Sequence, residues 1–243
     1  MSPEENRIAQ LYAAFNARDF ERCVAMMTPG VIWPDEAEDR LIVGAEDVLD
    51  YFTRVTSPLR AQYEPISLFK AAAGQVVVLT RQIITSASDG TLWSSTRVRH
   101  SFTLERGLVA RLESRQNDTD LQFPGVTAMI ERLHQAINAR NVEAVLACYA
   151  PDAHFQDRLE GQQLEGHAAI RAHFEHLFKT VRVNLSPLTY ALEPDDRVRV
   201  RLLVETRSPE GRMWQDGAIT VWYRLRTGVI VEQDIDDSGE DRA

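Results

Sequence analysis

The chain contains the same segment twice, and this repeat constrains its fold more than any other feature. A shift of 122 residues aligns the segment from Leu11 to Phe52 on the segment from Leu133 to Phe174 without a gap. Twelve of the 42 aligned positions are identical, which is far more than unrelated segments share. Self-similarity over this length indicates a duplicated structural unit.

The repeat extends to the end of the chain and sets the number of domains. A shift of 121 residues aligns the later glycines and tryptophans of the two halves, Gly90 with Gly211, Trp93 with Trp214 and Gly107 with Gly228. The 243 residues therefore predict two domains of the usual size, at residues 1–117 and 123–243. The segment Asn117–Pro124 is the expected linker.

Each half begins with helices and continues with strands. Ile8, Leu11, Tyr12 and Phe15 fall on one helical stripe, and shorter helices are expected at Asp19–Met27 and Glu46–Val55. Long strands are expected at Gln62–Ala71, Gln75–Ser86, Leu92–Glu105 and Leu108–Ser114. This order predicts an α+β fold of two tandem, cone-shaped domains, in which three N-terminal helices pack on a curved, mostly antiparallel sheet.

These patterns carry a resemblance to a known superfamily. The Asn-Ala-Arg-Asp turn at 16–19, the proline at 29, the strand ending at Asp35 and the glycine at 44 look like those of the nuclear transport factor 2-like superfamily. Its SnoaL-like polyketide cyclases, ketosteroid isomerases and lasalocid-type polyether epoxide hydrolases are the members that the chain resembles. The resemblance covers both halves and implies the fold more specifically than the function.

Asp35 is the first candidate catalytic residue. In ketosteroid isomerase-like enzymes, a general base lies 19 residues after the asparagine of the helix turn, and Asp35 and Asp157 both match that spacing from Asn16 and Asn138. Asp35 also shares the strand parity of Val31 and Trp33, so we expect its carboxylate to face the apolar interior, where desolvation strengthens a base. The alternative is a carboxylate that caps the hairpin and faces water.

His100 is the second candidate. It shares its parity with Val98, Phe102 and Leu104, so it should point inward. The resemblance implies that it occupies the position of the oxyanion-hole acid of ketosteroid isomerases, where a hydrogen-bond donor stabilises a developing enolate. The alternative is a core histidine with satisfied hydrogen bonds. The second half has Val221 at this position.

Glu64 is the third candidate. Its parity matches that of Ile66 and Leu68, which suggests an inward side chain. Lasalocid-type epoxide hydrolases pair an aspartate at the position of Asp35 with a glutamate near this place, although the spacing here is about two residues longer. The alternative is an exposed glutamate beside Pro65. The second half offers Ser186 instead.

The expected substrate contacts come from the apolar interior. We expect Tyr12, Trp33, Phe52 and Phe102 to line a cavity or to pack in the core, and Asp157 to have the equivalent place in the second half. The sequence shows no metal-ligand spacing, nucleophile elbow or phosphate-binding loop, so no metal and no cofactor are expected.

Composition excludes several classes of partner. A net charge of −9 argues against a nucleic-acid partner, and the sequence lacks an apolar run long enough to span a membrane. The absence of a signal-peptide pattern predicts a cytoplasmic protein. The two domains are expected to form an intramolecular pseudo-dimer through their sheets, with further homo-oligomerisation possible.

Together these features predict a cofactor-independent acid–base enzyme of isomerase, cyclase or epoxide hydrolase type. Its substrate would be a small apolar carbonyl or epoxide compound, such as a polyketide or terpenoid intermediate. The first half carries all three candidates and is expected to be the working domain. The competing hypothesis is a non-catalytic module that binds a small molecule or serves assembly.

Overall fold

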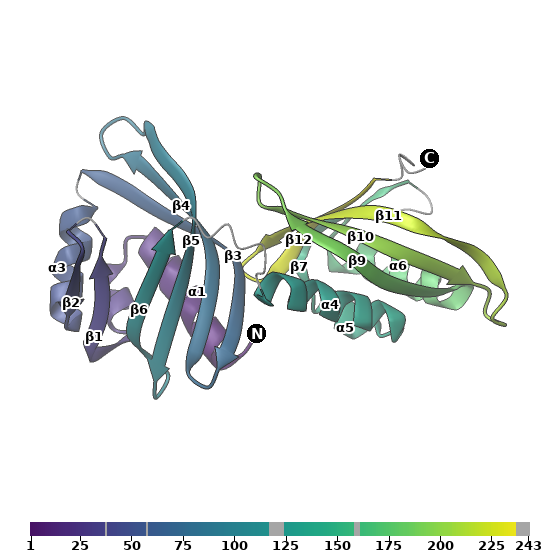
Figure 1. Ribbon diagram of the computed structural model, residues 1–243, viewed down its shortest axis with the longest axis horizontal. Helices are drawn as coiled ribbons and strands as arrows, with labels where there is room; N and C mark the ends of the chain where they lie inside the picture. The colour runs from purple at the N-terminus through teal and green to yellow at the C-terminus, as the bar shows by residue number, and fades with distance from the viewer. Residues whose placement is uncertain (37, 57, 117–123, 158–160, 237–243) are drawn as a thin grey trace. The chain divides into compact units, whose positions relative to one another are not determined.

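The protein folds into two units with the same architecture. The computed structural model describes residues 1–36, 38–56, 58–116, 124–157 and 161–236. The chain divides into Met1–Gly125, here domain 1, and Val126–Ala243, here domain 2 (Figure 1). All but the last residue of the predicted linker, Asn117–Pro124, lies outside the described residues. The pairing of the two sheets stays a prediction.

The helices of domain 1 begin where the sequence supplies capping groups. Ser2 and Glu5 form a reciprocal capping box that starts α1, and the side chain of Asp19 caps α2. α1 packs on the long strands β3 and β4, whereas α3 packs on β1 and β2. The helices are α1 (Pro3–Asn16), α2 (Phe20–Val24) and α3 (Ala45–Val55).

The sheet of domain 1 has six strands in the order β2-β1-β6-β5-β4-β3. Its neighbouring strands run antiparallel except for β1 and β6, which run parallel. The helices lie on one face of this sheet (Figure 1). The strands are β1 (Met27–Asp35), β2 (Arg40–Val43), β3 (Leu59–Ala72), β4 (Gln75–Ser86), β5 (Leu92–Glu105) and β6 (Leu108–Gln116).

Domain 2 repeats this arrangement. Its strand order, β8-β7-β12-β11-β10-β9, corresponds strand for strand to that of domain 1. The prediction of a tandem α+β fold with a mostly antiparallel sheet is therefore confirmed. The elements are α4 (Pro124–Asn138), α5 (Val142–Leu146), β7 (Tyr149–Gln156), β8 (Gln163–Glu165), α6 (Gly166–Thr180), β9 (Arg182–Leu192), β10 (Arg197–Arg207), β11 (Met213–Arg226) and β12 (Val229–Asp236).

The repeated asparagine at the end of the first helix has a structural role. The side chain of Asn16 donates to the carbonyl oxygen of Tyr63 and accepts from the Tyr63 amide, at 2.7 and 2.9 Å. Asn138 makes the same two bonds to the backbone of Leu185, at 3.0 and 2.7 Å. An amide side chain can donate and accept at once, so it ties the helix end to the edge strand in both domains.

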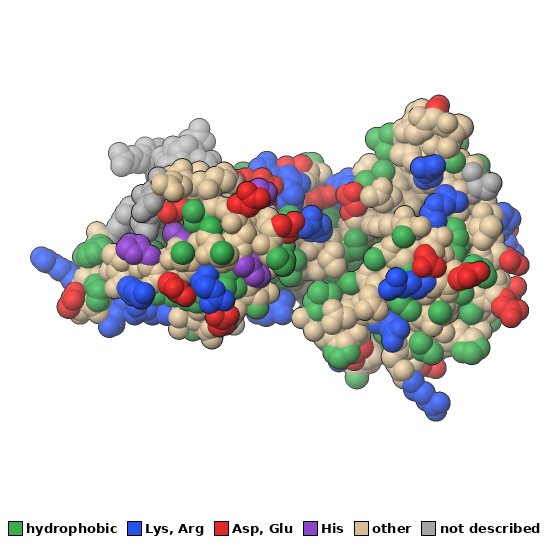
Figure 2. Space-filling model, turned by 180° about the vertical axis from the view of Figure 1, so that it is seen from behind, with side chains coloured by type: hydrophobic (Ala, Val, Ile, Leu, Met, Phe, Trp, Pro, Cys, Tyr) green, Lys and Arg blue, Asp and Glu red, His purple; other side chains and the backbone are tan. Residues whose placement is uncertain are grey.

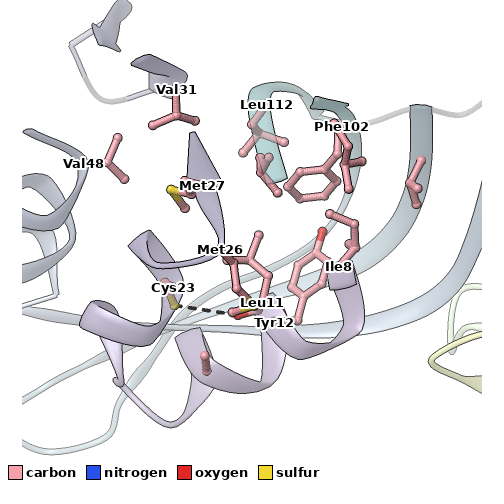
Figure 3. Packing of buried hydrophobic residues seen from close by; sticks show 14 of the residues in the cluster. Ile8, Leu11, Tyr12, Cys23, Met26, Met27, Val31, Val48, Phe102 and Leu112 are labelled. Carbon is pink, nitrogen blue, oxygen red and sulfur yellow. Dashed lines mark hydrogen bonds between the residues drawn. The ribbon is translucent and has the colours of Figure 1, made fainter. Parts of the chain in front are cut away.

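The core of domain 1 lies between its helices and the sheet. Figure 3 shows how side chains from α1, α2, β1 and β5 meet there, with the Cys23 thiol 3.8 Å from the carbonyl oxygen of Leu11. Burial of this apolar surface is the main source of the domain's stability. The most deeply buried residues of this core include Ile8, Cys23, Val31, Val48, Phe52, Val76, Val78, Phe102 and Val109.

Charged residues of both signs share the surface. On the face shown in Figure 2, basic and acidic side chains are interspersed on both domains. Among the described residues, no helix combines the length and the apolar character that crossing a bilayer requires.

The turn between β3 and β4 depends on Gly74. Its φ of +71° is a left-handed conformation, and an added Cβ would lie 2.7 Å from the carbonyl oxygen of Leu104. We expect Gly74→Ala to lower the free energy of unfolding by about 2–4 kcal/mol, because backbone strain and steric overlap add.

Gly90 provides the matched control for this turn. It has nearly the same φ, +73°, but a Cβ added there would meet no atom within 4 Å. Gly90→Ala should therefore cost only about 1 kcal/mol. Peptide-resolved hydrogen exchange in domain 1, recorded across a urea series, measures the loss of unfolding free energy in both variants. Equal losses would contradict the role of the Leu104 contact.

Candidate functional site

Domain 1 contains a cavity of about 470 Å³ between its helices and the concave side of the sheet. This volume lies within the range of sites that hold small organic molecules. Its lining is mostly apolar and rich in aromatic rings. Trp33 packs edge-on against Phe52 with ring centroids 5.2 Å apart. The predicted contact residues Tyr12, Trp33, Phe52 and Phe102 all line the cavity.

A buried tyrosine–histidine pair is the most distinctive polar feature of the cavity. The Tyr12 hydroxyl and Nδ1 of His100 share a hydrogen bond of 2.6 Å, and both side chains line the cavity. Burial lowers the pKa of the His100 imidazole to about 3 and raises the pKa of Tyr12 well above its ordinary value. Both groups are therefore uncharged near neutral pH.

This pair can donate a hydrogen bond to an oxygen in the cavity in either tautomer. When the Tyr12 hydroxyl donates to Nδ1, the His100 proton lies on Nε2. When Nδ1 donates, the hydroxyl keeps its own proton for another acceptor. The inward orientation that the sequence predicts for His100 is confirmed by its 5 % exposure beside Val98, Phe102 and Leu104.

Further polar groups surround the pair. Ser114 lies opposite His100 in the β5–β6 register, lines the cavity and has a buried Oγ without a hydrogen-bond partner among the described residues. The Tyr63 hydroxyl accepts a 2.9 Å hydrogen bond from the Gln82 amide. Burial raises the pKa of Tyr63 to about 12, so this phenol also stays protonated. The cavity wall is thus polar but uncharged around His100.

Asp35 is buried as predicted, but its side chain does not line the cavity. It is 1 % exposed, and its Oδ2 lies 3.2 Å from Nε of Arg40 and 3.6 Å from a terminal nitrogen of Arg54. Both arginines also pair with Glu38. The other oxygen, Oδ1, is buried without a hydrogen-bond partner in the described part of the chain. The alternative of a carboxylate that faces water is wrong, since Asp35 is buried, but its partners are Arg40 and Arg54 rather than the apolar side chains of the cavity.

The next residue, Glu36, lines the cavity instead. Its side chain is exposed. Burial raises the pKa values of Tyr51 and Tyr63, two tyrosines of the lining, and the charge of Glu36 adds to both increases. The sequence argument missed this carboxylate because strict strand parity places it on the outer side. β1 ends at Asp35, so parity no longer applies to Glu36.

The inward orientation expected for Glu64 is wrong. Its side chain is exposed and lies outside the cavity lining. The β3–β4 register shifts between Pro65 and Ser67, and this bulge reverses which side chains face inward. Before the bulge Ala61 and Tyr63 face the cavity, whereas Ile66 and Leu68 are buried after it. Parity counted across the bulge therefore gave the wrong side for Glu64.

Domain 2 has a smaller cavity, of about 130 Å³, with different polar groups. Asp157 lines it, and its Oδ2 lies 3.4 Å from Nδ1 of His173, which also lines it. Domain 2 also has a tyrosine–histidine pair, with the histidine on the helix and the tyrosine on the strand, although Tyr223 aligns with Phe102 rather than with His100. His134 on α4 corresponds to Tyr12, and its Nε2 lies 3.2 Å from the Tyr223 hydroxyl on β11. Burial lowers the pKa of His134 to about 4.

The sequence could have indicated some of these missed residues. His173 aligns with Tyr51 under the 122-residue shift, and Tyr223 lies on the predicted inward face of its strand. The hydrogen bonds that they make depend on pairings between a helix and a distant strand, which periodicity does not reveal. Within the described parts of the chain, no group of three or more His, Cys, Asp or Glu side chains could hold a metal ion.

A helix-covered curved sheet that encloses a cavity, present twice, defines the class of protein. The family known as the SnoaL-like domain matches residues 8–112 and again residues 130–233. The chain therefore belongs to the SnoaL-like family and contains two copies of its domain. No curated protein sequence matches the chain.

Solved structures resemble one domain of the chain at a time. A nuclear transport factor 2-like protein of unknown function from Burkholderia pseudomallei is 21 % identical, with a TM-score of 0.43, over 48 % of this chain and 92 % of its own. A putative polyketide cyclase from Sinorhizobium meliloti is 22 % identical, with a TM-score of 0.40, over 47 % of this chain and 100 % of its own. A Mycobacterium tuberculosis protein in complex with estradiol-17beta-hemisuccinate is 16 % identical, with a TM-score of 0.41, over 46 % and 92 %.

Proposed function

We propose that domain 1 binds a small apolar carbonyl compound and catalyses proton transfer at the carbon beside its carbonyl group. The observation that carries this proposal is the uncharged Tyr12–His100 pair in the wall of an apolar cavity. A donor of this kind stabilises the negative charge that develops on a carbonyl oxygen during enolisation. Such proton transfer needs an acid and a base but no cofactor.

The size of the cavity supports a substrate of two or three rings. An apolar protein cavity of about 150 Å³ holds one benzene molecule. The cavity of domain 1 measures about 470 Å³, roughly three times that volume. Its aromatic side chains, among them Trp33 and Phe52, suit a flat substrate because aromatic rings pack well edge-to-face or offset.

We assign the base to a carboxylate at the end of β1. Glu36 lines the cavity, so its oxygens can contact a bound ligand. Asp35, the candidate from the sequence, lies behind the lining and is paired with Arg40 and Arg54. Glu36 is therefore the preferred base, and Asp35 is the alternative in the same test.

The exposure of Glu64 gives no support to epoxide opening. That chemistry, as the resemblance implies it, uses two carboxylates in one cavity, and Glu64 lies outside it. A binding protein without catalysis would use the same cavity and donor pair. Exchange of substrate protons with solvent separates this possibility from an enzyme, because binding alone does not break a carbon–hydrogen bond.

The proposal is tested with 2-acetylnaphthalene, a two-ring methyl ketone. In D₂O the protein should exchange the methyl protons faster than buffer alone, as measured by proton NMR. The bound ketone should also show a lowered C=O stretching frequency, because a hydrogen bond weakens that bond. Binding without exchange would overturn the catalytic part of the proposal, and an unshifted carbonyl would overturn the donor assignment.

Three single variants identify the base in this experiment. Glu36→Gln should remove most of the exchange, whereas Asp35→Asn should leave most of it. Glu64→Gln is the matched control, since it removes an equivalent charge from an exposed side chain outside the cavity. A large loss from Asp35→Asn with little loss from Glu36→Gln would assign the base to Asp35.

A further inference from the structure

Domain 2 carries its own polar and aromatic arrangement around a separate cavity. Asp157 is 5 % exposed and lies beside His173, and both residues line the cavity. In domain 1 the equivalent Asp35 is not part of the cavity lining and pairs with Arg40 and Arg54. The 122-residue shift aligns Gln162 and His176 with these two arginines.

The wall beside this carboxylate is aromatic. The rings of Phe155, His173 and Phe174 contact one another pairwise, with centroids 5.0 to 5.5 Å apart. Rings that meet at these distances and angles offer edges and faces to a further ring. The rest of the lining is largely aliphatic and includes Leu202, Val204 and Ile219. An aromatic ligand is therefore favoured over a charged or open-chain polar one.

The volume of the cavity and the carboxylate of Asp157 further restrict the class of ligand. At about 130 Å³ the cavity is close to the 150 Å³ that holds a single benzene ring. A carboxylate accepts hydrogen bonds and repels other acceptors, so it selects a ligand that donates. An alkyl ketone or a carboxylate ligand would place oxygen lone pairs against Asp157. A hydroxyl group on the ring meets the requirement without a charge.

We propose that domain 2 is a second ligand site, distinct from that of domain 1, which binds a monocyclic phenol through the Asp157–His173 pair. The phenol ring packs against Phe155 and Phe174, and its hydroxyl donates to the pair. The protein then has two sites of different size, one for a two- or three-ring carbonyl compound and one for a single-ring phenol. This proposal does not depend on catalysis in domain 1.

The test uses 4-fluorophenol and the full chain, with fluorine NMR as the readout. Fluorobenzene, which lacks the hydroxyl, reports on the ring site alone. Asp157→Asn should weaken 4-fluorophenol about ten- to hundredfold, which is typical for the loss of a hydrogen bond to a charged group, and should change fluorobenzene binding less than twofold. Retained fluorobenzene binding shows that the cavity of the variant is intact.

Variants on one face of α6 supply the matched control. His173→Gln should weaken the binding of 4-fluorophenol, whereas His176→Gln should not, since His176 is exposed and one turn away.

The titration is repeated with saturating 2-acetylnaphthalene, which is too large for the domain 2 cavity. Persistent 4-fluorophenol binding is then expected. Wild-type affinity in both Asp157→Asn and His173→Gln, no binding at all, or complete displacement by the ketone would each overturn the proposal.

Discussion

The His100→Ala variant should exchange the methyl protons of 2-acetylnaphthalene about 10²–10³ times more slowly than the wild-type protein. The reason is the loss of a hydrogen-bond donor to the carbonyl oxygen, which typically costs that factor in rate. The effect should appear in the rate constant at saturating ketone more than in the affinity, because the donor matters most when charge develops. Proton NMR in D₂O measures both quantities.

The control variants separate the donor from simple packing. His100→Gln keeps an N–H donor and should retain far more activity than His100→Ala. Because burial lowers the pKa of His100 to about 3, the wild-type donor should stay neutral between pH 8 and pH 5. The pH profile of the exchange rate should therefore show no step due to His100 near 6.5, the ordinary pKa of histidine. If the two variants behave alike, His100 is a packing residue and the donor role is refuted.

The repeat explains why the fold was largely predictable from the sequence. Residues identical in both halves, such as Asn16 and Asn138, make the same backbone hydrogen bonds in both domains. The sequence pattern correctly predicts the bounds of β4 and β5. It also correctly predicts that His100 points inward, because the β5 segment from Val98 to Phe102 pairs in unbroken register with both β4 and β6. Local pattern and tertiary pairing agree in these elements.

The site was less predictable because its details depend on contacts between distant segments. A bulge at Pro65 moved Glu64 outward, and bulges leave little trace in hydrophobic alternation. Asp35 pairs with Arg40 and Arg54, which lie five and nineteen residues further along the chain, and its carboxylate is not part of the cavity lining. The partnership of Tyr12 with His100 spans 88 residues. A bulge decides the first of these side-chain positions and polar interactions are present at the other two, and hydrophobic periodicity encodes neither.

Replacing both Arg40 and Arg54 by alanine should destabilise domain 1 by about 2–4 kcal/mol. The two substitutions leave the Asp35 carboxylate buried without a compensating charge, and breaking a buried ion pair in this way is costly. The two arginine side chains are themselves 52 % and 54 % exposed, so solvent screening keeps the loss below that of a fully buried pair. Peptide-resolved hydrogen exchange across a urea series measures the loss in domain 1.

Adding Asp35→Asn to that double variant should recover about 1–2 kcal/mol, because the uncompensated charge disappears while the side-chain volume stays nearly constant. In the wild-type background the same substitution should destabilise, since it removes the buried negative charge that pairs with both guanidinium groups. If Asp35→Asn stabilises the double variant but destabilises the wild-type protein, the charge of Asp35 is the cause of the stability changes. A triple variant no more stable than the double would mean that the arginines act through packing, and Asp35 would then need another reason for its absence from the cavity lining.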